Sequence, residues 1–158
     1  MTGQGIDVEE VQRRGTVVVG VDGSEPSILA LWWAVEQAEV RDCVIHAVRV
    51  WQSPFGIGIP PPTRSSLPKW GTSHWGASVL LELRDTVGQA LPHRPDGLRI
   101  STVEGNPAAS LLRVCADDDA ELLVVGHRGL GGFAQMLVGS VSEQCFLHAQ
   151  CPVVVIRG

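Results

Sequence analysis

The sequence predicts an α/β fold, in which helices cover both faces of a parallel sheet. Apolar, β-branched runs alternate along the chain with segments whose apolar residues recur at helical spacing. The apolar runs are continuous rather than alternating, which is typical of strands buried on both faces. Strands joined through helices lie parallel and are connected by right-handed crossovers. A chain of 158 residues is long enough to form one such domain without a disulfide or a metal.

The expected elements follow in chain order. Strands are predicted at residues 16–21, 44–50, 98–103, 121–126 and 152–156, and helices at residues 25–40, 79–91, 107–116 and 140–149. Ser24 is the expected N-cap of the first helix, and Pro26 fits its first turn. We expect a flexible leader at residues 1–15 and a single domain at residues 16–158. The proline-rich stretch at about residues 52–76 predicts a surface insertion in that domain.

Charge and lysine content exclude several classes of function. The net charge is −5 and basic residues do not cluster beyond Arg13 and Arg14, so neither nucleic acid nor an anionic membrane is an expected partner. The sole lysine, Lys69, lies in the proline-rich stretch. A P-loop needs a lysine beside its glycines, and a Schiff-base enzyme needs one in a desolvated pocket, so both are excluded.

Cysteine usage and hydropathy predict the cellular location of the protein. The four cysteines form no C-x-x-C pair and follow no secretory signal, so we expect buried thiols in a reducing cytosol. The longest unbroken apolar run, residues 28–35, is much shorter than the roughly 20 residues that span a bilayer. We therefore expect a soluble, cytoplasmic protein.

A glycine-rich stretch after the fourth predicted strand is the strongest candidate site. It begins at Gly126 and ends at Gly139 and Ser140, where the last helix is expected to start. Glycines leave backbone N–H groups unobstructed, and a helix N-terminus adds positive potential, so phosphate is the natural ligand. Ser140 is the expected N-cap, and its hydroxyl can turn toward an anion, while Arg128 can add charge. The glycines by themselves are equally compatible with a tight structural turn.

Asp22 is the second candidate, at the carboxyl end of the first predicted strand. Ligands of open α/β sheets bind beyond the carboxyl ends of the strands, where the strand order reverses. If the first and fourth strands are neighbours, Asp22 and the glycine stretch face one crevice. Its carboxylate could then accept hydrogen bonds from ribose hydroxyls or an adenine amino group. The alternative is that Asp22 only caps the helix that follows it.

Three motifs in order along the chain resemble the universal stress protein family, in its nucleotide-binding form. The pattern G-x2-G-x9-G-[S/T] is matched by Gly126, Gly129, Gly139 and Ser140. The opening V-V-G-V-D-G-S at residues 18–24 and the ending H-A-x-C-P-V-x-V at residues 148–155 match as well. The resemblance extends from about residue 16 to residue 157. One departure is His127, which stands where members of the family often carry a small Ser or Thr.

The resemblance implies a Rossmann-like five-stranded parallel sheet of order 3-2-1-4-5 and a homodimer formed through the C-terminal strand, residues 152–156. It also implies ATP as the ligand, with or without Mg²⁺, in a regulatory or sensor protein of the stress response. The adenosine would be lined by Gly20, Val21 and Asp22, with Ala47 touching adenine. The phosphates would be held by Gly126, His127, Arg128, Gly129, Leu130, Gly131, Gly132, Gly139, Ser140 and Val141.

The sequence leaves alternatives to an ATP-binding regulatory protein open. A slow ATPase or phosphohydrolase could use the same site, and any such activity would start at His127. An interaction dimer without nucleotide is a further alternative, which the intact glycine set disfavours. An ATP pyrophosphatase would carry S-G-G-x-D-S after its first strand, and a phospho-receiver domain would carry a lysine after its last strand. Neither feature is found at the corresponding positions of this chain.

Three remaining patterns are interpreted as structural. The spacing Cys145-x2-His148-x2-Cys151 resembles a metal motif, but no fourth ligand is evident, so we expect no metal. The acidic run at residues 117–119 is expected to be a solvated helix end. Hydrolytic catalysis is not expected either, because no G-x-S-x-G elbow occurs and none of the five histidines has a serine or cysteine partner evident from sequence.

Overall fold

The computed structural model describes residues 14–53, 71–128 and 139–158. In chain order the elements are β1 (Thr16–Gly20), α1 (Glu25–Arg41), β2 (Val44–Trp51), α2 (Gly71–Ala90), β3 (Leu98–Glu104), α3 (Pro107–Asp117), β4 (Ala120–Gly126), α4 (Ser140–His148) and β5 (Val153–Ile156). All nine predicted elements are confirmed, and all but one of their boundaries lie within one residue of the prediction. Residues 1–13 of the expected leader and residues 54–70 of the expected insertion lie outside the described ranges.

The largest boundary difference is at α2, which begins at Gly71 rather than near residue 79. Its first two turns fall within the stretch predicted to be an insertion. The last proline of that stretch is Pro68, so nothing prevents a helix from starting soon after it. Residues 71–78 carry few apolar residues at helical spacing, which is why the pattern did not reveal them.

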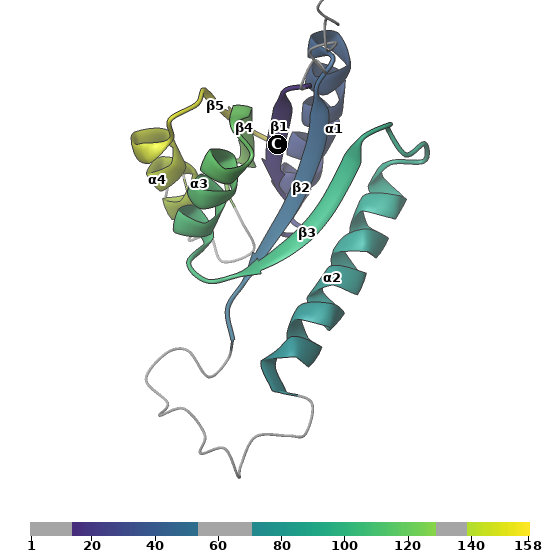
Figure 1. The fold of residues 1–158 in the computed structure, drawn as a ribbon, viewed down its shortest axis with the longest axis vertical. Helices are drawn as coiled ribbons and strands as arrows, with labels where there is room; N and C mark the ends of the chain where they lie inside the picture. Colours follow the sequence, from purple (N-terminus) through teal and green to yellow (C-terminus); the bar gives the residue numbers. More distant parts are fainter. Residues whose placement is uncertain (1–13, 54–70, 129–138) are drawn as a thin grey trace, which may run out of the picture.

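The sheet has the predicted topology. Five parallel strands lie in the order β3-β2-β1-β4-β5. Helices α1 and α2 lie on one side of it and α3 and α4 on the other (Figure 1). β3 and β5 are therefore the two edge strands, and β1 lies at the centre.

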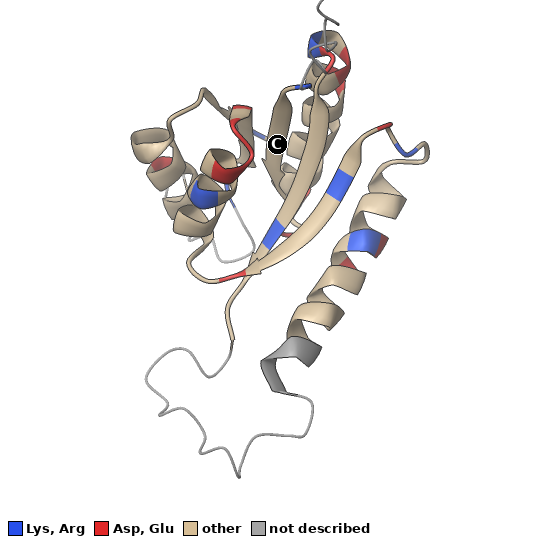
Figure 2. Cartoon of the chain, in the orientation of Figure 1, with Lys and Arg blue, Asp and Glu red and all other residues tan. Residues whose placement is uncertain are grey.

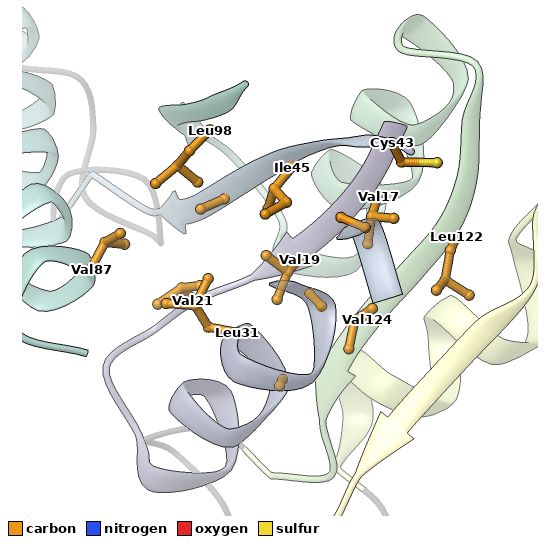
Figure 3. Close-up of a cluster of buried hydrophobic side chains, with 14 of the residues drawn as sticks. Val17, Val19, Val21, Leu31, Cys43, Ile45, Val87, Leu98, Leu122 and Val124 are labelled. Carbon is orange, nitrogen blue, oxygen red and sulfur yellow. The ribbon is translucent and has the colours of Figure 1, made fainter. Parts of the chain in front are cut away.

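Two hydrophobic clusters form the core, one on each face of the sheet. On the α1 and α2 side, Val17 and Val19 of β1 pack with Leu31 of α1 and with Val124 of β4 (Figure 3). Val18 faces the opposite way, into the cluster formed with α3 and α4. All three valines have no exposed surface, which explains why β1 is continuously apolar in sequence.

The helix N-caps confirm one prediction, correct another and add a cap that was not predicted. Ser24 is the N-cap of α1, as predicted, and Asn106 caps α3 by accepting a hydrogen bond from the Ala109 amide at 3.1 Å. The N-cap of α4 is Gly139, whereas Ser140 was expected there. Ser140 is instead the first helical residue and is exposed, because the chain is still extended at Gly139, with φ −72° and ψ 154°.

The cysteines are confirmed as free thiols. Cys43, Cys115 and Cys145 are buried, and Cys151 is half-buried. Burial is the main cause that raises the pKa of the Cys145 thiol to about 11, so it stays protonated at neutral pH. Within the described ranges, no helix combines the length and the apolar character that a bilayer span requires.

Candidate functional site

The candidate site lies where β1 and β4 end side by side. Val19 of β1 is in register with Val124 of β4, and the two strands end at Gly20 and Gly126. From β1 the chain crosses to β2 on one side, whereas β4 lies on the other side, so the strand order reverses between them. The condition stated for the crevice, that the first and fourth strands are neighbours, is therefore met.

Asp22 shapes the loop between β1 and α1. Its Oδ1 accepts two hydrogen bonds from Ser24, one from the backbone N–H at 2.9 Å and one from the hydroxyl at 2.6 Å. The N-cap position belongs to Ser24, and its hydroxyl is turned toward Asp22 rather than toward the helix amides. Asp22 is half-buried, and the two bonds from Ser24 fix the orientation of its carboxylate just beyond the end of β1.

Gly126 allows the end of β4 to pack directly on the start of α1. A Cβ atom added there would lie 2.8 Å from the carbonyl carbon of Pro26 and 3.0 Å from the Ser27 nitrogen. Both neighbours are backbone atoms in a helix, which cannot move aside easily. The first glycine of the motif is therefore required by packing, independently of any ligand.

His127 ties three elements together through its main chain. Its N–H donates to the Ile156 carbonyl of β5 at 2.8 Å, and its carbonyl accepts from the Gly139 N–H at 2.7 Å. Its ring is half-buried, and the Nδ1 atom is fully enclosed without a hydrogen-bond partner in the described part of the chain. A buried polar atom without a partner is rare in native proteins and points to a missing ligand or water.

The start of α4 closes the other side of the site. A Cβ atom on Gly139 would lie 2.9 Å from the His127 carbonyl oxygen, so this glycine also has a packing role. Ser142 was missed by the sequence analysis. Its buried hydroxyl donates to the carbonyl of Gly139 at 2.9 Å and reaches that of His127 at 3.3 Å. The one signal in the sequence for these hydrogen bonds is the position of Ser142, two residues after the expected N-cap Ser140.

The two loops of the site touch each other. The Ser24 hydroxyl reaches the carbonyl oxygen of Arg128 at 3.5 Å, joining the loop after β1 to the loop after β4. Ser140 and Val141 lie in the first turn of α4, where unpaired helix N–H groups attract anions. Four of the predicted phosphate-binding residues lie outside the described ranges: Gly129, Leu130, Gly131 and Gly132.

The residues assigned to the adenosine differ in accessibility. Gly20 is half-buried at the end of β1, but Val21 is 2% exposed and Ala47 has no exposed surface. Both of these side chains point into the core cluster beneath α1 and α2. Ala47 is level with Val19, and β2 continues past the end of β1 to Trp51, so that β2 forms a wall beside the crevice.

A second polar cluster was not expected. His46 Nδ1 lies 2.6 Å from Asp118 Oδ2, and His46 Nε2 lies 2.7 Å from the Ser101 hydroxyl oxygen. The prediction that no histidine has a serine partner is therefore wrong for His46, because the two residues come together only through the pairing of β2 with β3. The prediction of a fully solvated acidic run is wrong for Asp118, whose side chain is 14% exposed.

These features define an open, parallel α/β protein with a candidate anion-binding crevice at its topological switch point. The chain belongs to the universal stress protein family, whose model matches residues 13–157. It is 31% identical to universal stress protein Rv2623 of Mycobacterium tuberculosis over 154 residues, which cover 92% of this chain and 46% of that protein. The chain thus spans about half the length of this relative. It is 29% identical to universal stress protein MJ0531 of Methanocaldococcus jannaschii, covering 89% of this chain and 81% of that one.

Solved structures share the fold. A universal stress protein crystallised in complex with cAMP has a TM-score of 0.66 at 23% identity and covers 92% of this chain and 98% of its own. The universal stress protein of Archaeoglobus fulgidus in complex with dAMP has a TM-score of 0.58 at 21% identity, covering 91% of this chain and 98% of its own. At these identities the likeness concerns the fold.

Proposed function

We propose that this protein binds ATP, with or without Mg²⁺, in the crevice between β1 and β4. The observation that carries the proposal is the enclosed, unpartnered Nδ1 atom of His127, beside the N-terminus of α4. A ring nitrogen there can hydrogen-bond to a phosphate oxygen, and the first-turn amides of α4 add positive potential. The cAMP-bound and dAMP-bound members of the fold family support an adenine nucleotide.

Each part of the nucleotide has a proposed set of contacts. Gly20, Val21 and Asp22 face the adenosine, and the fixed carboxylate of Asp22 accepts from the ribose hydroxyls. The Ala47 side chain is fully buried in the core, so we assign its contact with the adenine to its main chain. The phosphates lie against the segment from Gly126 to Gly132 and the first residues of α4, which are Ser140 and Val141.

The protein is proposed to act as a dimer in the cytoplasm and to change its behaviour with nucleotide state. β5 is an edge strand of half-buried valines and isoleucine, and such an edge is prone to pair with another strand. The peptide of His127 joins the crevice to this strand through its bond to Ile156. Light scattering at micromolar concentration should give the mass of a dimer, and a monomer would contradict this part of the proposal.

The first experiment is to identify the nucleotide retained by the purified protein by mass spectrometry. ATP is then titrated calorimetrically into the stripped protein, with and without Mg²⁺. The Asp22→Asn variant keeps an oxygen acceptor for Ser24 but loses the charge, and we expect it to weaken binding about tenfold, in line with one charge-assisted hydrogen bond. His127→Ala and Gly129→Ala should weaken binding by at least as much.

Asp117→Asn is the matched control, because Asp117 is exposed at the end of α3 and far from the crevice. It should bind ATP as the unmodified protein does. Absence of binding by the unmodified protein would overturn the proposal and favour an interaction dimer. If the unmodified protein releases phosphate from ATP and His127→Ala does so at the same rate, His127 has no role in ATP hydrolysis.

A further inference from the structure

Ser101, His46 and Asp118 form a hydrogen-bonded chain on the side of the sheet that α3 covers. His46 lies on β2, Ser101 on the adjacent edge strand β3, and Asp118 is the C-cap of α3. The nucleotide crevice is elsewhere: it lies at the carboxyl ends of β1 and β4, whereas Asp118 lies just before the start of β4. The turn between α3 and β4 is the acidic segment visible beside the sheet in Figure 2.

The neutral His46 tautomer that carries its proton on Nδ1 gives every group in this cluster a matching partner. In this tautomer the Nδ1–H of His46 donates a hydrogen bond to Asp118 Oδ2 at 2.6 Å, because a carboxylate can only accept. The lone pair of Nε2 is then aimed at Ser101, whose hydroxyl donates to it at 2.7 Å. Arg99 Nη2 also donates to Asp118 Oδ2 at 2.6 Å, which helps to hold the carboxylate in this orientation.

The hydrogen bond between His46 and Asp118 is partly protected from solvent. The side chains of His46 and Asp118 are 12% and 14% exposed, so their bond is largely shielded from water. Ser101, on the edge strand β3, is half-buried. A nucleophile is activated in this way when a shielded base lies within hydrogen-bond reach of its hydroxyl.

The surface next to Ser101 indicates the class of substrate. Side chains two residues apart on a strand share a face, so Val103 follows Ser101 on the same side, and Val50 of β2 is in register with Val103. Both valines are half-buried, and they offer a small apolar strip beside the hydroxyl. A short acyl chain fits such a strip. As β3 is an edge strand, alternate backbone N–H groups on its outer side have no strand partner in the described sheet and can stabilise an oxyanion.

We propose that Ser101 and His46 are the catalytic residues of a second, hydrolytic site for short-chain acyl esters, with Asp118 as the positioning residue. The Ser101 oxygen attacks the ester carbonyl while His46 Nε2 takes its proton. The C–O bond to the alcohol breaks, and His46 returns the proton to the departing alkoxide. Water then attacks the acyl-serine, His46 again transfers the proton, and the carboxylic acid leaves with Ser101 restored.

The test uses the full-length protein and two readouts. A fluorophosphonate probe should label Ser101, as located by peptide mass spectrometry, and p-nitrophenyl acetate should be hydrolysed with an acyl-enzyme burst. Ser101→Ala should abolish labelling, and His46→Gln should slow both reactions at least 100-fold, the range found for loss of a general base. Asp118→Asn should lower kcat about as much, with little change in KM.

Controls separate catalysis from background and from structure. His93→Ala removes an exposed imidazole outside this cluster and should leave the rate unchanged, which excludes nonspecific ester cleavage by surface histidine. Arg99→Ala breaks the same ion pair as Asp118→Asn but keeps the carboxylate beside His46, so it should slow labelling far less. Thermal unfolding of each variant shows whether it is folded.

The proposal is overturned by absence of labelling at Ser101 in the folded, unmodified protein. It is also overturned if Ser101→Ala hydrolyses the ester at the original rate. Equal losses in Arg99→Ala and Asp118→Asn would assign Asp118 a purely structural role and remove it from the catalytic chain.

Discussion

Replacing Gly126 with alanine should destabilise the folded chain even in the absence of nucleotide. The added Cβ would lie 2.8 Å and 2.9 Å from two atoms of Pro26 and 3.0 Å from the Ser27 nitrogen, so β4 and the start of α1 must move apart. Gly126 is not among the glycines with positive φ, so the cost is steric rather than conformational. Overpacking of this kind costs about 2 kcal/mol, which corresponds to a melting temperature roughly 4–8 °C lower for a domain of this size.

Gly88→Ala is the matched control for this substitution. Gly88 lies inside α2, and an added Cβ there meets nothing within 4 Å. Alanine in a helix interior is favoured over glycine by about 0.5–1 kcal/mol, so this variant should be slightly more stable. Urea unfolding monitored by circular dichroism measures both changes. If Gly126→Ala unfolds at the same urea concentration as the unmodified protein, the packing argument fails and the glycine is left with a ligand role alone.

Three further predictions concern stability. Asn106→Ala removes the cap of α3 and should lower the free energy of unfolding by about 1 kcal/mol in urea titrations; no change would show that the Ala109 bond contributes nothing. Leu31→Ala should cost about 3 kcal/mol because Leu31 is fully buried, whereas Leu81→Ala, at a residue 61% exposed, should cost less than about 0.5 kcal/mol, and equal costs would contradict the burial argument. The pKa of the Cys145 thiol is raised from 9.0 to about 11, so the unfolded thiol ionises first as the pH rises. Stability should therefore fall between pH 9 and pH 11 by up to about 2 kcal/mol, after allowance for screening, and Cys145→Ala should lose less over that window.

The positions of the strands were predictable because they depend on local pattern. β1 contains an unbroken run of valines because both of its faces are buried. Burial of both faces requires apolar residues whichever side chains pack against them, so the pattern can be recognised in the sequence alone. The strand order came from the family resemblance rather than from periodicity. The start of α2 was missed because its first two turns carry little apolar periodicity, so that the sequence shows no helix there.

The candidate site was predictable in part. Asp22 and Gly126 follow strands, and the ends of parallel strands meet at one edge, so their proximity follows from topology. The packing role of Gly126 was not visible, because it depends on how closely α1 approaches β4. The link between His46 and Asp118 spans 72 residues and depends on where α3 ends, which no local pattern encodes.

The hydrogen bond from the Gly139 N–H to the His127 carbonyl makes the chain leave and re-enter the fold at one point. His127 and Gly139 are therefore fixed to each other, whatever the length of the chain between them. Lengthening a closed loop is thermodynamically inexpensive, about 0.6 kcal/mol for each doubling of its length. Insertions between these two residues should therefore cost the sheet little stability, because the bond that joins β4 to the start of α4 does not depend on the length between them.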